Sequence, residues 1–404
     1  MAPATTTGDA GFDRRVRSFT ARRQRLGGHP VAADSDGGAS GAADPAERLL
    51  AALHAVVAVY SSQPSGPLSL AARVDGFDAA AYAALEHDQR RAVRVPAMRL
   101  SSHLVPTDTV ARVTAATRPP LERVAWSLKA LGLTLDDDFP TLRDQLVDAA
   151  ATPLAAKPLR EALGWPAEQV RSVAQIAAVE GTVLRVGGAG LRSNAVGWVA
   201  TEAWLGAPLD RPDPDAALAW LAGEYLRAFG PAGVDDFAWW TSCGKQRAAT
   251  AVAGLDTVEV APGLLLRADD AEVFAAVEPL PDDHVDLVPV WDAYTMGYPS
   301  TGRARFGPPE VLDRLYDPAG NGLGVVLAGG RAVGSWNSRF RGRTMEVDME
   351  ALGRWPAAVR RSVDARLAGL AELLGAHDLV VVPVAGGTRR PVGGKGNRRS
   401  YVTG

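Results

Sequence analysis

Arginine and lysine clusters are the residues of this 404-residue chain whose type and spacing best suit a chemical task. Guanidinium and ammonium groups bind phosphate, and such binding tolerates loose geometry. Because the whole chain has a net charge of −3, local clusters would have to bind a nucleic acid. Candidate contacts to double-stranded DNA are Arg22, Arg23, Arg25, Arg94, Arg99, His103, Lys245, Arg247, Arg339, Arg341, Arg343, Arg398 and Arg399. His103 lies in an alternating strand, so it faces either the core or this surface.

Histidine, cysteine and acidic side chains are placed less favourably for catalysis. The six histidines show no spacing typical of a metal site, and Cys243 is the single cysteine. The acidic run 136–138 favours a solvated turn over a divalent-metal site. Glu86 and Asp88 are expected at a solvated helix end. We therefore expect no metal ion.

The composition is that of an ordinary globular protein. Hydrophobic residues make up 47% and charged residues 22%, and the chain is too long for one ordinary core. No segment approaches the roughly 18 consecutive apolar residues of a membrane helix, and the N-terminus lacks an apolar signal core. We expect a cytoplasmic protein of several domains with no membrane contact.

A repeated order of elements predicts three similar units in an α+β protein. Each unit has two or three short helices and then a pair of short strands, the pattern of a winged helix, in which a helix-turn-helix precedes a β-hairpin wing. The predicted division is a basic N-terminal arm and flexible linker (1–44), three tandem winged helices (45–117, 118–210 and 211–278) and a β-rich, barrel-like C-terminal domain (279–404).

Three local predictions bear on the site. An apolar helix is expected over residues 45–60, and residues 379–384 are expected to form a buried strand. The turn at 187–190 is rich in glycine, which favours backbone geometry with positive φ over phosphate binding.

Five stretches of the chain resemble tandem winged-helix DNA glycosylases of the AlkZ and YcaQ type. Two of them, at 93–106 and 288–298, are similar to the family stretches MRGTLHLVP and LPxFDPYLLGY. The resemblance extends from about residue 14 to residue 404. The five stretches are VRVPAMRLSSHLVP (93–106), YLRAFGP (225–231), DFAWW (236–240), VPVWDAYTMGY (288–298) and GGRAVGSW (329–336).

The resemblance implies a C-shaped molecule in which three winged helices surround a basic concave channel. Active members of the family hydrolyse the N-glycosidic bond of N7-alkylated or bulky purine adducts, without a metal or redox cofactor. They carry a Gln-x-Gln or Gln-x-Asp pair after the first long helix. Here that segment is VYSSQPSGP (59–67), which lacks at least one of the two polar residues. The resemblance therefore leaves Gln63 and Ser61 as candidate catalytic residues.

Two hypotheses follow for Gln63. Its amide could orient a water molecule toward the anomeric carbon of a damaged nucleotide. Alternatively, the polar residues 61–63 only cap a helix and lead into a Pro-Ser-Gly-Pro turn.

The leading hypothesis for the whole chain is a monomeric, nucleoid-associated protein that binds damaged duplex DNA and excises the modified purine, in DNA repair or self-resistance. The alternative is a non-catalytic winged-helix protein that regulates transcription or shields a lesion. A small-molecule enzyme using Asp292 and Tyr294 is the third possibility, but the stretch around them is more typical of packing between domains.

Overall fold

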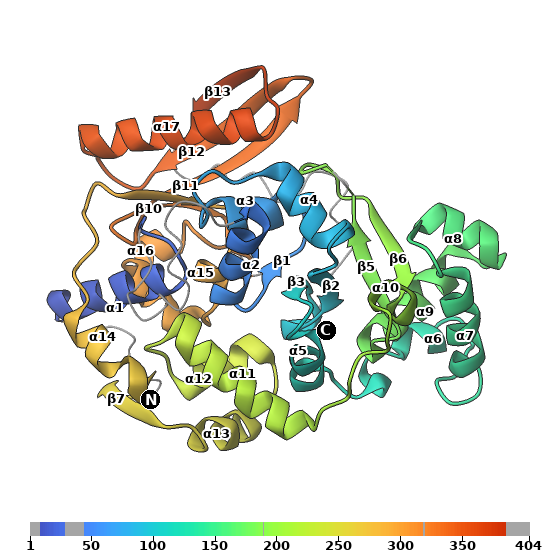
Figure 1. Cartoon of the computed structure of the whole chain (residues 1–404). Coiled ribbons are helices and arrows are strands. Elements are labelled where there is room, and N and C mark those ends of the chain that lie inside the picture. The colour runs from blue at the N-terminus through green and yellow to red at the C-terminus, as the bar shows by residue number, and fades with distance from the viewer. Residues whose placement is uncertain (1–8, 29–43, 189, 318–319, 385–404) are drawn as a thin grey trace.

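The computed structural model describes residues 9–28, 44–188, 190–317 and 320–384, and it mixes helices with three separate β-sheets. Figure 1 shows helices α6–α9 at one end of the molecule and the sheet crossed by α17 at the other. The expected α+β class is confirmed. The sheets contain six, five and two strands, and the C-terminal one is open rather than a closed barrel.

The first predicted unit contains most of the residues around Gln63. Asp44 caps the first helix and Pro45 begins it, but the helix ends at Ala55 instead of residue 60 because Val57 takes a positive φ of 67°. The chain then enters a short strand that pairs with β3. The elements are α2 (Pro45–Ala55), β1 (Val59–Tyr60), α3 (Ser65–Ala71), α4 (Ala79–His87), β2 (Ala92–Pro96), η2 (Met98–Leu100), β3 (Ser102–Pro106) and α5 (Val110–Thr117).

The second unit shares a sheet with the first. Its predicted hairpin is present as β5 and β6, and β5 pairs with β2 through Arg94 and Arg185. The strand order β1-β3-β2-β5-β6-β4 is therefore continuous across both units. The elements are η3 (Leu121–Arg123), α6 (Trp126–Lys129), α7 (Phe139–Ala149), β4 (Leu154–Ala155), α8 (Ala156–Leu163), α9 (Ala167–Glu180), β5 (Val183–Gly187), β6 (Val196–Ala200) and α10 (Thr201–Leu205).

The third unit is built around a long buried helix. Asp213 caps this helix, Pro214 begins it, and its apolar face contributes Leu221, Tyr225 and Phe229 to the main core. The two-stranded sheet of this unit is separate from the other sheets. The elements are α11 (Pro214–Phe229), α12 (Val234–Thr241), α13 (Lys245–Ala253), β7 (Thr257–Ala261), β8 (Leu264–Arg267), η4 (Ala268–Asp270) and α14 (Ala271–Ala276).

The C-terminal region is a five-stranded sheet of order β13-β12-β11-β10-β9, with α17 across one face. The predicted buried strand is wrong: β13 is an edge strand, and Val380, Val381 and Val382 are exposed because no further strand or helix covers them among the described residues. The elements are β9 (Val285–Val288), α15 (Ala293–Met296), η5 (Ser300–Phe306), α16 (Pro309–Leu312), β10 (Gly324–Ala328), β11 (Arg331–Arg341), β12 (Thr344–Ala351), α17 (Ala357–Leu373) and β13 (Asp378–Pro383).

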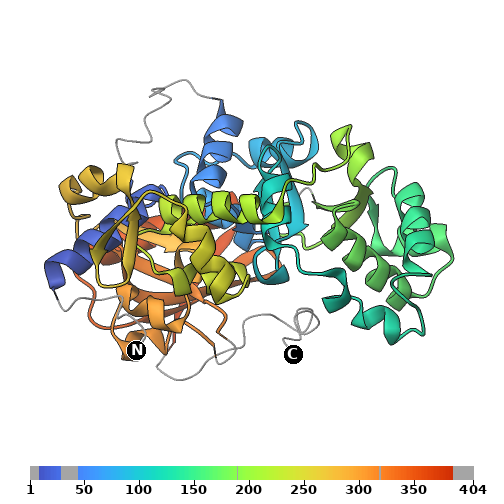
Figure 2. The same cartoon turned by 90° about the horizontal axis from the view of Figure 1, so that it is seen from below.

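The segment expected to be a basic arm is an integral helix, α1 (Ala10–Arg23). Its apolar side chains Val16 and Phe19 pack against Phe274 of α14, and its Thr20 hydroxyl donates a hydrogen bond of 2.9 Å to the Gly230 carbonyl. Figure 2 shows this helix beside the elements of the third unit. The many arginines of this segment suggested an exposed arm, but the helix also has an apolar face that packs into the fold. None of the helices in the described ranges has the length and apolarity to cross a membrane.

Candidate active site

The Gln63 segment leaves the sheet at the end of β1. Tyr60 lies opposite His103 on β3, and the Ser61 amide then donates a hydrogen bond of 3.0 Å to the Ser102 carbonyl. The Ser61 hydroxyl donates to the Ser102 hydroxyl at 2.8 Å, and the backbone N–H of Gln63 donates to Asn194 Oδ1 at 2.9 Å. Gln63 is thus held between the first predicted unit and the β5–β6 loop of the second.

The capping role considered for residues 61–63 is not observed. Helix α3 begins at Ser65 with Pro64 at its N-cap position, and no side chain caps it. The Gln63 side chain is 5% exposed, and neither its Oε1 nor its Nε2 makes a hydrogen bond of normal geometry within the described part of the chain. A buried amide in this state costs stability unless water or a ligand satisfies it.

Two hydroxyls near Gln63 are in the same state. The Ser62 and Tyr82 hydroxyls are buried and make no hydrogen bond of normal geometry to residues that the structure describes, although the Tyr82 hydroxyl lies within reach of the Gln63 and Arg94 side chains. Burial raises the pKa of Tyr82 to about 12, although interactions with Arg94 and Gln63 partly offset this increase. Neutral polar groups gathered in this way form the kind of surroundings in which proteins hold ordered water.

A buried ion pair borders these groups. Arg94 pairs with Glu86 at 2.7 Å, both side chains are 3% exposed, and Arg94 also donates to the Ser61 carbonyl at 2.9 Å. The expected position of Arg94 on a DNA-facing surface is wrong, as is the expected position of Glu86 at a solvated helix end. The sequence could not show that these residues, on α4 and β2, face each other across the core.

Gly187 contacts this ion pair and does not form a left-handed turn. Its amide donates to Glu86 Oε1 at 2.7 Å, and a side chain at this position would overlap the Arg94 guanidinium. Gly187 and its neighbour Gly188 do not have positive φ, so the expected reason for this glycine-rich turn is wrong at both positions. The close approach of Arg94 explains the glycine at 187.

His103 faces inward, the structural alternative of the two considered. Its Nδ1 lies 2.9 Å from the Ser101 carbonyl, and its ring packs 4.4 Å from the Tyr60 ring. Burial lowers the pKa of His103 to about 4, with Arg99 acting in the same direction and the Ser101 carbonyl against it. His103 is therefore neutral at neutral pH.

The three candidate arginines at the end of α1 and just after it differ in exposure. Arg23 is buried and paired with Asp270, so its expected position on a DNA-facing surface is wrong. Arg22 donates to the Glu278 carbonyl at 3.4 Å, and Arg25 is half-buried. A DNA contact by Arg22 or Arg25 stays a prediction.

The remaining candidate cations lie in other parts of the molecule. On α13, Lys245 pairs with Asp235 at 3.0 Å and Arg247 with Asp215 at 2.8 Å. In the β11–β12 hairpin, Arg339 and Arg341 share Glu346, whereas Arg343 is exposed and has no ion pair within the described ranges. Arg398 and Arg399 lie outside the described residues. The structure brings Ser61, Gln63, Arg94, Arg99 and His103 together, and leaves the α1, α13 and hairpin cations apart from them.

Asp292 is a packing residue, as its sequence context indicated. Its carboxylate accepts hydrogen bonds from Arg73 at 2.7 and 2.8 Å and from Ser69 at 2.6 Å, and it caps α15 by accepting from the Tyr294 amide. The Arg73 and Asp292 side chains are 0% exposed. This network joins α3 to the C-terminal region.

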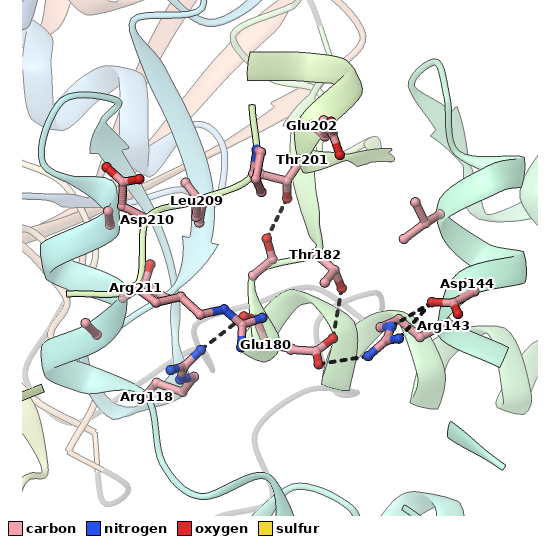
Figure 3. Close-up of a pocket in the computed structure, with 16 residues that line it drawn as sticks. Arg118, Arg143, Asp144, Glu180, Thr182, Thr201, Glu202, Leu209, Asp210 and Arg211 are labelled. Atoms are coloured by element: carbon pink, nitrogen blue, oxygen red, sulfur yellow. Dashed lines mark hydrogen bonds and ion pairs between the residues drawn. The ribbon is translucent and has the colours of Figure 1, made fainter. Parts of the chain in front are cut away.

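A cavity of about 360 Å³ lies away from Gln63, between α5, α7, the end of α9 and the segment before α11. Figure 3 shows Arg118, Arg143 and Arg211 among the residues that line it, together with Glu180 and Asp144. Arg143 pairs with both of these acids, at 2.8 Å to Asp144 and 3.1 Å to Glu180. None of the predicted site residues lines this cavity.

Sequence reasoning missed several residues of the site. Tyr82, Asn194 and Trp239 lie on three different predicted units, and no local pattern connects them with Gln63 or Arg99. The Trp239 ring lies 3.9 Å from the Arg99 guanidinium. The alternation of apolar residues along β2 would have been the signal for Arg94, since an arginine between Val93 and Val95 in a strand buried on both faces needs an internal partner.

Comparisons with known proteins agree with the sequence resemblance. The family model described as DNA glycosylase AlkZ-like matches residues 46–373. The solved structure of Streptomyces sahachiroi DNA glycosylase AlkZ has a similar fold, with a TM-score of 0.69 and 22% identity over 92% of this chain and 99% of that chain. No curated protein matches the chain. Since the family model spans well over half of the sequence, this chain belongs to the AlkZ-like DNA glycosylase family.

Proposed function

We propose that this protein binds duplex DNA as a monomer and hydrolyses the N-glycosidic bond of N7-alkylated or bulky cationic purines, in DNA repair or self-resistance. Family membership supports DNA as the partner. The single observation that carries the catalytic part is the buried Gln63 amide, whose polar atoms lack hydrogen bonds of normal geometry within the described ranges.

The proposed reaction needs an oriented water molecule. Water attacks C1′, the C1′–N9 bond breaks, the purine leaves with the bond's electron pair, and the water's proton passes to solvent. Because the Gln63 side chain lies beneath the surface, the water rather than the sugar contacts its Oε1. The amide positions this water and stabilises it as positive charge develops on the sugar.

The state of the nearby carboxylate restricts the substrate class. Glu86 accepts from Arg94 and from the Gly187 amide, so it is not available as a general base. An amide is a weak base, and catalysis must then depend on a good leaving group. A purine alkylated at N7 carries a positive charge that is neutralised when the bond breaks, which is why we propose cationic rather than neutral lesions.

The test is excision from a duplex that contains one N7-methylguanine, followed by heating in alkali. We expect strand breaks with the wild-type protein, at least a tenfold lower rate with Gln63→Ala, and an unchanged rate with Gln175→Ala, a control at an exposed glutamine of α9. Equal rates for wild type and Gln63→Ala would contradict the assignment of Gln63.

A non-catalytic lesion-binding protein is the second candidate. The observation that favours it is the state of the Ser61 hydroxyl. This hydroxyl is buried and bonded to Ser102, so it does not act as a second free polar group beside Gln63. Tight, salt-sensitive binding to the same duplex without strand breaks would support this alternative over the enzyme.

A further inference from the structure

The turn between β2 and β3 has a costly backbone conformation. Arg99 and Leu100, which are adjacent, have φ values of 55° and 58°. The side chains of L-amino acids clash with the backbone in this region, and glycine normally occupies such positions. The turn is closed by hydrogen bonds from the Leu100 amide to Ala97 and from the Ala97 amide to Ser101, at 2.7 and 3.0 Å.

The Arg99 side chain anchors this turn through two contacts. The Arg99 guanidinium lies 3.9 Å from the centre of the Trp239 ring on α12, and it donates a hydrogen bond to the Tyr60 hydroxyl. The Leu100 side chain is 37% exposed. The fold therefore leaves part of an apolar side chain exposed at a position where glycine would be easier to accommodate, and strained residues of this kind are often functional.

Leu100 is close to the candidate active site along the chain. Ser102 follows it by two residues and accepts the Ser61 hydroxyl hydrogen bond, and Gln63 follows Ser61 by two residues. The turn and the Gln63 segment are thus tied by a direct side-chain contact.

We propose that Leu100 is a wedge that enters the base stack of duplex DNA beside the damaged purine. This inference rests on the proposed function. An apolar side chain inserted between base pairs offsets part of the stacking energy lost when a nucleotide is displaced from the helix. Because the Arg99 side chain is held by Trp239 and Tyr60, the turn keeps its conformation when Leu100 contacts the bases.

The test uses the full chain and a duplex with 2-aminopurine next to N7-methylguanine, because 2-aminopurine fluoresces more strongly when it is unstacked. Fluorescence, binding anisotropy and Tm are measured for wild type, Leu100→Ala, Leu100→Gly and Leu131→Ala. Leu131 is the matched control, since it is also 37% exposed but lies in the second predicted unit. Glycine relieves the backbone strain, so Leu100→Gly tests the side chain without a cost in folding.

We expect the wild-type protein and Leu131→Ala to raise the fluorescence severalfold. Both Leu100 variants should lower this increase and the excision rate at least fivefold, with the Tm of Leu100→Gly equal to or above that of wild type. An undiminished increase with Leu100→Gly, or a wild-type protein that binds the duplex without unstacking it, would overturn the wedge and leave the proposed function standing. A wild-type protein that binds no duplex by anisotropy would overturn both.

Discussion

Two buried ion pairs of this protein have the same chemistry but different surroundings. Around Arg73 and Asp292, the carboxylate is saturated by side chains and by the Tyr294 amide, and Gln24 also accepts from Arg73. Around Arg94 and Glu86, both carboxylate oxygens also accept hydrogen bonds, but the side-chain amide of Gln63 and the hydroxyl of Tyr82 nearby make none of normal geometry to residues that the structure describes. The first arrangement joins parts of the fold, and the second contains the polar groups to which we assign the catalytic water.

The largest effect is expected from breaking the pair of Arg73 and Asp292. Asp292→Ala leaves the Arg73 guanidinium buried without its partner, which should lower the free energy of unfolding by about 3–5 kcal/mol in urea denaturation. The double variant Arg73→Met with Asp292→Ala should recover much of this loss, because it removes both buried charges. A double variant no more stable than Asp292→Ala would show that Asp292 acts mainly as the cap of α15.

Acid should weaken the region that contains Gln63. The pKa of His103 is about 4 in the folded protein and 6.5 in an ordinary environment, so the unfolded chain binds a proton more readily. The contribution of neutral His103 is complete above pH 6.5 and falls by up to about 1.4 kcal/mol per pH unit as pH decreases toward 4. Urea denaturation at a series of pH values should show a shallower loss for His103→Gln, and identical pH dependence in the two proteins would contradict this account.

A smaller loss of stability is expected when a methyl group is added next to the Arg94 guanidinium. Gly187→Ala forces the Arg94 guanidinium to move, which should cost about 1–3 kcal/mol of stability. The control is Gly369→Ala on α17, where the space around the Cβ position is open. Gly206 also has open space, but its positive φ makes it less suitable. Gly369→Ala should be neutral or stabilising, and a Gly187→Ala protein as stable as that control would show that Arg94 has room to adjust.

The smallest effect on stability is expected at the surface. Arg247 and Asp215 form an exposed pair on α13 and α11, so Arg247→Ala should change the free energy of unfolding by about 0.5 kcal/mol or less. If Arg247 contacts a phosphate as predicted, the same variant should weaken duplex binding severalfold and reduce the salt dependence by about one ion. An unchanged salt dependence would remove Arg247 from the DNA-binding surface.

The sequence predicted elements better than it predicted partners. Helix α9 ends at Gly181, which takes a left-handed conformation, and a glycine of this kind after an apolar helix is a local signal that the sequence displays. Arg94 was expected to face DNA because its positive charge can be read from the sequence. Its pairing with Glu86 across the core cannot be read in that way. The single pairing of Arg94 with Arg185, which joins two sheets into one, likewise depends on tertiary contacts that no periodicity encodes. The division into winged-helix units stays a prediction.

The most direct test of the comparison is the replacement of Gln63 by leucine, measured for both stability and excision. Leucine has a similar size and removes two buried polar atoms that lack hydrogen bonds of normal geometry in the described part of the chain. We predict that Gln63→Leu unfolds at an equal or higher urea concentration than wild type and releases N7-methylguanine at least tenfold more slowly. A variant that is destabilised but excises the lesion at the wild-type rate would show that Gln63 is only a structural residue.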